Sequence, residues 1–546
     1  MPQYKLHQFT KNILWLIGIL LSLTACKDKD TKNRDHLVFR YNEHSNITSL
    51  DPAFAKDQRN IWGCNQLYNG LTQLDHSLQV QPDIAASWMV SEDGLQYTFT
   101  LRSDVYFHKS PLFGIDSTRT VTAQDFVYSL ERLRDPKVAS PGAWILQNVA
   151  TIAAKDSQTL VIQLQKPFPA FLGLLAMKFC SVVPKEVVIH YQNDFRSHPI
   201  GTGPFKFKHW EENVKLVFRK NELYYEKDAL GNSLPYLEAV AITFLPDKQS
   251  ELLQFVQGNI DFLNSLDPSY KDELLTPTGQ LRDKYIAQFN MITAPYLNTE
   301  YLGIFLDSKT PEIQSELLRK AMNYGFDRKK MITYLRNGIG TPANHGFIPK
   351  GLPGFNNLKG YDYQPQLAKQ LLNQYKKATG DDSPKITIST GGQYLDICEY
   401  IQRELEKIGF IVAIDVMPPS TIRKQRSVGN LDIFRSSWVA DYPDAENYLS
   451  LFYSKNFAPN GPNYTHFKNT QYDDWYEKAL ITPSQEDRVK LYQKMDSLLL
   501  QKAPIIPLYY DEVVRFTQKN VSDLGINAIN LLDLRRVKKG KLEVRD

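Results

Sequence analysis

The chain has 546 residues, well above the roughly 250–300 at which a single hydrophobic core stops growing, so we expect two or more lobes. Hydrophobic residues make up 42% of the chain and charged residues 23%, as is ordinary for a globular protein. The formal net charge of +4 disfavours a nucleic-acid-binding protein, because such a protein needs a strong basic excess on one face.

Residues 1–25 are typical of a bacterial lipoprotein signal peptide. After a basic start, the apolar run 13–23 is too short for a membrane span but suits the core of a signal peptide. Small residues then precede Cys26, a pattern that resembles the lipobox, in which the cysteine is diacylated and becomes the mature N-terminus. We expect residues 26–36 to form a flexible tether, since they carry charges and no apolar side chain that could pack. The alternative is a plain secretory signal with an incidental cysteine.

Motifs for metal binding and catalysis are absent from the sequence. The remaining cysteines, Cys64, Cys180 and Cys398, have no zinc spacing, so we expect buried structural thiols, with one disulfide as the alternative. There is no HExxH, GxSxG or P-loop motif, and no two of the ten histidines stand three or four residues apart. These absences predict no metal and no cofactor, and they disfavour an enzyme.

The N-terminal half alternates between predicted strands and helices. Asp93-Gly94 is a hairpin turn signal, and Thr122 is the expected N-cap of a helix. We expect strands over 37–41, 97–101, 159–164 and 240–245, helices over 60–71, 121–132, 168–177 and 249–258, and a loop leading to a short helix over 78–88. This rhythm argues for α/β units on a sheet.

The C-terminal half continues the same rhythm. Two helices are expected within 311–339, with Asp327 as the N-cap of the second. The apolar strand 503–510 contains prolines, which favour an edge or a crossover. Further predicted elements are helices over 395–408, 472–480 and 485–502 and strands over 386–390, 410–416 and 431–438.

The stretch 431–444 carries the candidate site. Its first half is typical of a strand and Pro443 favours a turn, so Arg435, Trp438 and Asp441 should lie near one end of a sheet. A fixed cation, a flat aromatic surface and an anion suit an extended zwitterionic ligand. The alternative is a strand with a surface arginine, a core tryptophan and an aspartate that caps the turn.

Segments spread over nearly the whole mature chain carry a further signal. They are Tyr97-Thr-Phe-Thr-Leu-Arg102, Val121-Thr-Ala-Gln-Asp-Phe-Val-Tyr-Ser-Leu130, Gly201-Thr-Gly-Pro-Phe205, Gly258-Asn-Ile-Asp261, Leu318-Arg-Lys-Ala-Met-Asn-Tyr-Gly-Phe-Asp-Arg328 and Trp438-Val-Ala-Asp-Tyr442. In these segments and in their order along the sequence, the chain resembles the peptide/nickel (family 5) extracellular solute-binding proteins of ABC transporters, above all their oligopeptide-binding branch. The segment 109–120 is longer than the usual turn of that family.

The resemblance implies an α/β fold of the two-lobed periplasmic-binding-protein type (type II, class C). Two strands would form the hinge, and an α+β domain would be inserted in the first lobe. Carried onto this chain, lobe one would comprise 37–69, 191–291 and 509–546, the inserted domain 70–190, and lobe two 292–508.

The resemblance also implies roles for the candidate residues. The acid that matches Asp441 binds the N-terminal ammonium of the peptide in that branch. Strand backbone at Trp438 and Val439 would bind the peptide main chain as an added strand. Arg426 and Arg435 match cations that meet the peptide C-terminus, and a guanidinium suits a carboxylate because it donates two parallel hydrogen bonds.

Two departures from the branch affect the expected site. Where the branch offers an acid from the facing lobe, this chain has Lys56, with Asp57 beside it, and where the branch has a histidine for the C-terminus, it has Gln393. The preferred peptide length and the details of the amine pocket therefore stay open.

The implied function is a lipid-anchored, extracytoplasmic and monomeric peptide-binding protein that delivers its cargo to an ABC permease and catalyses nothing. Within the family, the alternatives are a nickel chelate, haem, an oligosaccharide or an opine as cargo. From other classes, the alternatives are an extracytoplasmic peptidase and a chaperone-like or signalling receptor without a permease. Lys27, rather than an aspartate, follows Cys26, which leaves an outer-membrane, cell-surface or Gram-positive location open.

Overall fold

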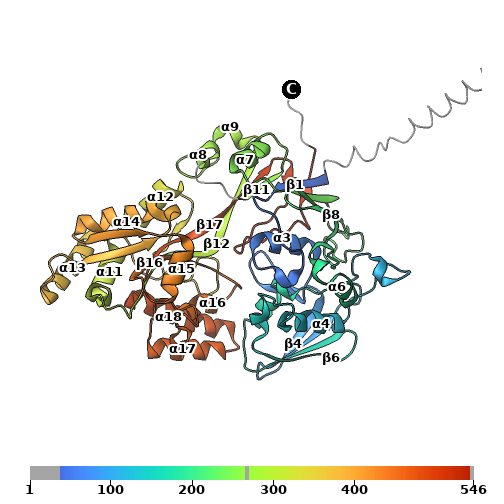
Figure 1. The fold of residues 1–546 in the computed structure, drawn as a ribbon, viewed down its shortest axis with the longest axis horizontal. Coiled ribbons are helices and arrows are strands. Elements are labelled where there is room, and N and C mark those ends of the chain that lie inside the picture. The colour runs from blue at the N-terminus through green and yellow to red at the C-terminus, as the bar shows by residue number, and fades with distance from the viewer. Residues whose placement is uncertain (1–36, 265–269, 542–546) are drawn as a thin grey trace, which may run out of the picture.

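An eleven-stranded sheet runs through both lobes of the protein (Figure 1). The computed structural model describes residues 37–264 and 270–541, so the predicted signal peptide, tether and lipidated Cys26 lie outside the described residues. The strands in spatial order are β15 (Ile411–Val416), β14 (Lys385–Thr390), β16 (Ile433–Val439), β12 (Phe289–Ile304), β17 (Ile505–Gln518), β11 (Phe262–Asn264), β1 (Val38–Asn42), β10 (Ala239–Thr243), β9 (Lys215–Lys220) and β8 (Phe205–Glu211), while β13 (Thr341–Pro342) pairs with β17 off this path.

Two long strands, β12 and β17, connect the lobes. They pair antiparallel from Phe289 opposite Gln518 to Gly303 opposite Ile505. At one end β17 pairs with β11 of lobe one, and at the other end β12 pairs with β16 of lobe two. The register shifts between Pro295 and Thr299, midway along β12. The proline-containing strand expected over 503–510 therefore crosses between lobes inside the sheet.

Lobe one is built on the parallel pair β1 and β10. Aromatic side chains fill its core, and the rings of Tyr41, Trp62 and Phe262 meet at 6.0–6.3 Å between centroids. Trp62 lies on α3 (Gln58–Leu67), which begins at the N-cap Asp57 and ends before the expected Leu71 because Tyr68 is extended. Other helices of this region are α7 (Lys248–Val256), α8 (Lys271–Leu274) and α9 (Asp283–Ile286).

The inserted domain holds a separate four-stranded antiparallel sheet, β4 (Ala85–Val90), β5 (Gln96–Leu101), β7 (Thr159–Leu164) and β6 (Val149–Ala154). Helix α4 (Ala123–Arg134) packs on it, with Phe126 and Leu130 in the core. As predicted, Thr122 is the N-cap of this helix, and Asp125 completes a capping box. Further elements here are β2 (Thr72–Leu74), β3 (Val80–Pro82), α5 (Phe171–Leu175) and α6 (Lys185–Tyr191).

The prediction for 78–88 is wrong. Instead of a loop and a short helix, the chain forms β3 and then β4, with Trp88 opposite Phe99 of β5. Pro82 and Asp83 favour a loop locally, but the hairpin closed by Asp93-Gly94 offers a partner strand, and this tertiary pairing overrides the local preference.

Lobe two surrounds β14, β15 and β16 with helices. Helix α14 (Leu395–Ile408) ends at Gly409, whose φ of 109° is a left-handed conformation. Its bounds are the predicted ones, and Asp327 is the predicted N-cap of α12. The remaining helices are α10 (Pro311–Gln314), α11 (Glu316–Tyr324), α12 (Arg328–Arg336), α13 (Pro365–Thr379), α15 (Pro419–Ser427), α16 (Glu446–Leu449), α17 (Thr470–Leu480) and α18 (Gln485–Lys502). Near the C-terminus, β18 (Val521–Ser522) pairs with β19 (Lys538–Lys539).

The described residues also bear on the predicted thiols and on metal binding. Cys64, Cys180 and Cys398 are buried and unpaired, as expected for structural thiols. Within 37–264 and 270–541, no helix is both long and apolar enough to cross a membrane, and no cluster of possible metal ligands forms. The exact boundaries of lobes and inserted domain stay a prediction.

Candidate functional site

A cavity of about 360 Å³ lies where lobe one, the inserted domain and lobe two meet. Lobe two contributes Tyr296, Val439 at the end of β16, and the residues 440–443, which follow this strand. The opposite walls include Lys56, Gln58 and Trp62 of lobe one, Trp144, Met177 and Phe179 of the inserted domain, and Ile529 and Leu531 of the C-terminal segment. The candidate residues Asp441 and Val439 therefore face a cavity shared by both lobes.

The loop after β16 rests on the inserted domain. Tyr442 is buried in the core of that domain, with its ring centroid 6.4 Å from those of both Trp144 and Phe168. The backbone N–H of Ala440 donates to the carbonyl of Leu297 at 2.9 Å, which ties the loop to the hinge strand β12. These contacts hold the loop at the cavity.

Asp441 is exposed to the cavity, and its carboxylate has no cationic partner among the described residues. Its one side-chain partner is Asn447, whose amide nitrogen donates to Oδ2 at 3.3 Å. Desolvation by the surrounding protein raises the pKa of Asp441, and the hydrogen bond from Asn447 acts in the opposite direction. The ionised carboxylate of Asp441 would therefore be stabilised by a cation that a ligand brings to the site.

Trp438 lies behind Asp441 rather than at the cavity. Its indole N–H donates to Oδ1 of Asn447 at 2.9 Å, and its ring packs against the core of lobe two. The same Oδ1 accepts the backbone N–H of Asp441 at 3.1 Å. Trp438 therefore acts on the site through Asn447.

Arg435 forms a largely buried ion pair with Glu300. Its side chain is 13% exposed, and its guanidinium carbon lies 3.2 Å from the centroid of the Tyr394 ring. Glu300 also accepts a hydrogen bond from Asn298 at 3.0 Å. The charge of Arg435 is thus neutralised within lobe two, away from the cavity that Asp441 lines.

Arg426, on α15, is the other predicted cation. It donates to Oγ of Ser436 at 2.6 Å and lies 4.0 Å over the ring of Tyr464. In the part of the chain that the structure describes, it forms no ion pair with an acid. Arg426 therefore keeps an uncompensated charge next to β16, although it too stays off the cavity wall.

Strand β16 has a partly open edge. Its pairing with β12 runs from Ile433 to Val439, whereas its pairing with β14 covers only Ile433 and Phe434. From Arg435 to Val439, no described strand pairs with its other edge. An open edge next to the cavity is what an added ligand strand requires.

The two departures from the oligopeptide branch occupy different places. Lys56 lines the cavity from lobe one, while its neighbour Asp57 is engaged in capping α3, where it accepts the backbone N–H of Asn60 at 3.2 Å. Gln393 is exposed and lies off the cavity. Among the two, only Lys56 can meet a ligand next to Asp441.

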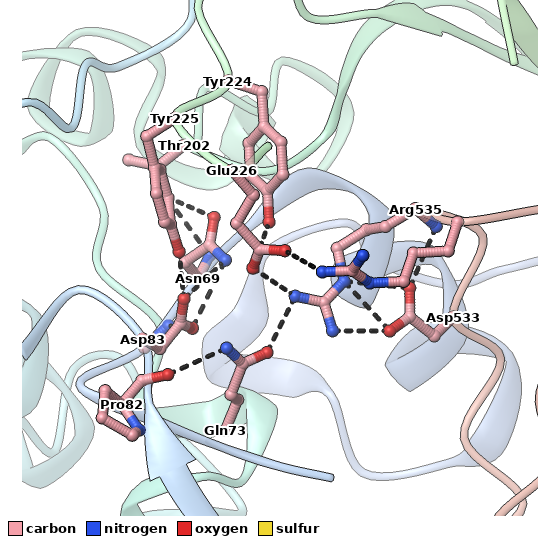
Figure 2. Close-up of polar contacts among 12 residues, drawn as sticks. Asn69, Gln73, Pro82, Asp83, Thr202, Tyr224, Tyr225, Glu226, Asp533 and Arg535 are labelled. Atoms are coloured by element: carbon pink, nitrogen blue, oxygen red, sulfur yellow. Dashed lines mark hydrogen bonds and ion pairs between the residues drawn. The ribbon is translucent and has the colours of Figure 1, made fainter. Parts of the chain in front are cut away.

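Ile529 and Leu531, on one wall of the cavity, belong to a C-terminal segment that a polar network anchors (Figure 2). Arg535 donates to Glu226 at 2.5 Å and to Gln73 at 2.8 Å, and it pairs with Asp533. Nearby, Asp83 accepts hydrogen bonds from Asn69 at 3.0 Å and from Tyr225. The network joins the C-terminal segment to lobe one and to the inserted domain.

Sequence reasoning missed two supporting residues, Asn447 and Glu300. Asn447 lies on α16, after the turn at Pro443, and no spacing rule links it to Asp441. Glu300 lies on the hinge strand, 135 positions before its partner Arg435. Glu300 could have been found only by predicting that its strand, β12, pairs with β16, which carries Arg435.

Comparisons with known proteins agree with this architecture. The chain matches the family model for bacterial extracellular solute-binding proteins, family 5 Middle, over residues 79–460, more than half of its length. The glutathione-binding protein GsiB of Salmonella typhi is 24% identical over 488 residues, which cover 88% of this chain and 90% of that protein.

Solved structures share the fold. HbpA2 from Haemophilus parasuis gives a TM-score of 0.81 at 24% identity and covers 92% of this chain and 100% of its own. The unliganded open form of the murein tripeptide-binding protein MppA gives 0.77 at 26% identity, with 92% and 98% covered. DppA from Helicobacter pylori in complex with the peptide STSA gives 0.72 at 26% identity, with the same coverage. The chain therefore belongs to the family 5 bacterial extracellular solute-binding proteins and is a binding protein rather than an enzyme.

Proposed function

We propose that this protein captures short peptides in the cavity between its lobes and delivers them to an ABC permease. The observation that carries the proposal is Asp441, a carboxylate without a cationic partner in the described chain, in a cavity lined by both lobes. Closing the lobes desolvates the ligand, and a buried ammonium is very costly unless it is paired and hydrogen-bonded. Asp441 supplies that pairing.

The remaining proposed contacts come from strand β16 and from the arginines beside it. The open edge of β16 binds the peptide main chain, with Val439 nearest the cavity. Arg426, which has no acidic partner among the described residues, meets the C-terminal carboxylate of longer peptides. Arg435 joins it only by leaving Glu300. Similar proteins whose names refer to glutathione, murein tripeptide and the peptide STSA support a peptide-like cargo.

The proposal includes closure by population shift. Only a ligand that contacts both lobes favours the closed arrangement, and the two hinge strands allow the lobes to move as units. It also includes a lipid anchor on Cys26, tested by incorporation of labelled fatty acid into the wild-type protein and its loss in Cys26→Ser.

Calorimetry tests the proposed amine site. Trialanine and N-acetyl-trialanine are titrated into the wild-type protein, into Asp441→Ala and into Asp382→Ala, which removes an exposed acid elsewhere on lobe two. We expect Asp441→Ala, and acetylation of the peptide, each to weaken binding by about a hundredfold, while Asp382→Ala changes nothing. Equal affinity for both peptides would refute the role of Asp441.

The cargo itself is tested independently. Mass spectrometry of ligand released from the purified protein should detect short peptides. Detection of an opine, a haem, an oligosaccharide or a nickel chelate in their place would reassign the cargo within the same family.

A further inference from the structure

The cavity between the lobes has two charged side chains among the described residues that line it, and they carry opposite signs. Lys56 extends from lobe one, and Asp441 extends from lobe two. The other lining residues are neutral and mostly apolar, with Trp62, Trp144 and Phe179 among them. Each lobe therefore brings one charge to the same small space.

Neither charge is neutralised by the described protein. Among the described residues, no acid lies within ion-pair distance of the exposed side chain of Lys56. The backbone at Lys56 is held by a hydrogen bond from the Lys56 N–H to the carbonyl of Phe54 at 2.8 Å. The adjacent Asp57 is engaged by the N–H of Asn60 and lies 3.7 Å from Arg59. The two cavity charges also form no ion pair with each other. Both are left for a ligand.

A ligand that presents a cation to one lobe and an anion to the other pairs both charges at once. Closing the lobes removes water from the cavity, which strengthens each pairing in the largely apolar surroundings. It also raises the cost of leaving Lys56 without an anion. A ligand with both groups therefore stabilises the closed arrangement more than one with the ammonium alone.

The size of the cavity limits how far apart these two groups can be. At about 360 Å³, it is at the lower end of the range of roughly 300–1,000 Å³ for ligand pockets. A cavity of this size favours a ligand whose ammonium and anion lie close together, on one residue or on neighbouring residues. A carboxylate on the first residue meets this requirement, whereas the C-terminus of a longer peptide does not.

We infer that Lys56 is a specificity-determining residue, which selects peptides that carry a carboxylate on the same residue as the free ammonium. This inference rests on the proposed peptide site at Asp441. A first residue can have this chemistry in two ways: an α-linked acidic residue such as glutamate presents its side-chain carboxylate, and a γ-linked glutamate presents its α-carboxylate.

Calorimetry with three matched tripeptides tests the inference: Gln-Ala-Gly, Glu-Ala-Gly and γ-Glu-Ala-Gly. The first two peptides differ in charge at nearly constant shape. In the third, the free carboxylate is the α-carboxylate, next to the α-ammonium. We expect the wild-type protein to bind at least one of the two glutamyl peptides about tenfold or more tightly than Gln-Ala-Gly. The preferred glutamyl peptide identifies the source of the anion.

Variants at Lys56 complete the test. We expect Lys56→Gln to equalise the three affinities by weakening only the glutamyl peptides, and Lys56→Glu to reverse the order. Lys155→Gln, which removes an exposed lysine of the inserted domain, should behave as the wild type. Thermal unfolding confirms that each variant is folded.

Two failures are distinguishable. If the wild-type protein binds all three peptides equally and Lys56→Gln changes nothing, the role of Lys56 is refuted while the peptide site stands. If the wild-type protein binds none of them, the proposed peptide function fails, and the inference fails with it.

Discussion

Asn447 holds Asp441 at both ends, through the backbone N–H at 3.1 Å and through the carboxylate at 3.3 Å. The same amide oxygen accepts the indole N–H of Trp438, so both polar atoms of the Asn447 side chain are engaged at the site. Because Asn447 is buried, this arrangement fixes the direction in which the carboxylate points. A ligand ammonium therefore meets an acceptor that is already oriented, which reduces the entropy lost on binding.

Binding should weaken on acidification earlier than for an ordinary carboxylate. An ammonium pairs with Asp441 only when the acid is ionised, and desolvation raises its pKa above the usual 3.8. Affinity for trialanine should therefore be constant at neutral pH and fall as the pH drops toward the raised pKa. Calorimetry from pH 8 to pH 4 measures this profile. A profile that stays flat down to pH 4 would contradict the role of the ionised carboxylate.

Replacement of Asn447 by aspartate should move that profile. Asn447→Asp keeps an oxygen for the N–H groups of Trp438 and Asp441 but loses the donor to the carboxylate and adds a like charge. Both changes favour the protonated form of Asp441, so the midpoint of affinity loss should rise by about one pH unit. Asn373→Asp, at an exposed position on α13, is the control and should leave the midpoint unchanged. An unchanged midpoint in Asn447→Asp, with normal thermal unfolding, would show that Asn447 does not position the acid.

Much of lobe two could be predicted from the sequence, because its signals are local. The bounds of α14 follow from a helical apolar stripe that ends at Gly409, and Asp327 caps α12 through its own side chain. Strands β3 and β4 could not be predicted, because Pro82 and Asp83 favour a loop and the pairing of β4 with β5 is not visible in the local sequence. Local propensity and tertiary pairing conflict there, and pairing prevails.

The candidate site divides in the same way. Asp441 follows directly from a strand and a turn in one stretch, and the structure places it at the cavity. The surroundings of Arg435 could not be read from that stretch, because its partner Glu300 comes from a strand more than a hundred residues away. Whether a cation serves a ligand or a neighbouring acid depends on such long-range pairing.

Arg435 should prove to be important for stability. Arg435→Ala leaves Glu300 buried without its cation, which costs about 3–5 kcal/mol of unfolding free energy. We expect a lower midpoint of thermal unfolding at pH 7 and recovery of most of the loss in the double variant Glu300→Gln/Arg435→Met, since no unpaired charge remains. Arg403→Ala, at an exposed position on α14, should have little effect. A direct role of Arg435 in binding is tested on the folded double variant by comparing the affinities of peptides with those of their C-terminal amides. If the wild-type protein discriminates between the two and the double variant does not, Arg435 also binds the ligand.

Asp496 should make the stability of the protein depend on pH. This carboxyl on α18 is fully buried, accepts the backbone N–H of Phe347 at 2.7 Å and has no cationic partner among the described residues, and desolvation raises its pKa to about 7. In the unfolded chain its pKa returns to near 3.8, so between these values the native state binds more protons, and the free energy of unfolding falls as the pH rises from about 4 to about 7. Asp496→Asn keeps an acceptor for Phe347 and carries no charge.

The variant should therefore unfold at a temperature a few degrees higher than the wild type at pH 8, and the difference should shrink or change sign at pH 4.5. Differential scanning calorimetry at both pH values measures it, with Asp474→Asn, an exposed acid on α17, as the control that should show no such difference. If Asp496→Asn lowers the unfolding temperature equally at both pH values, its hydrogen bonds, and not its buried charge, determine what it contributes.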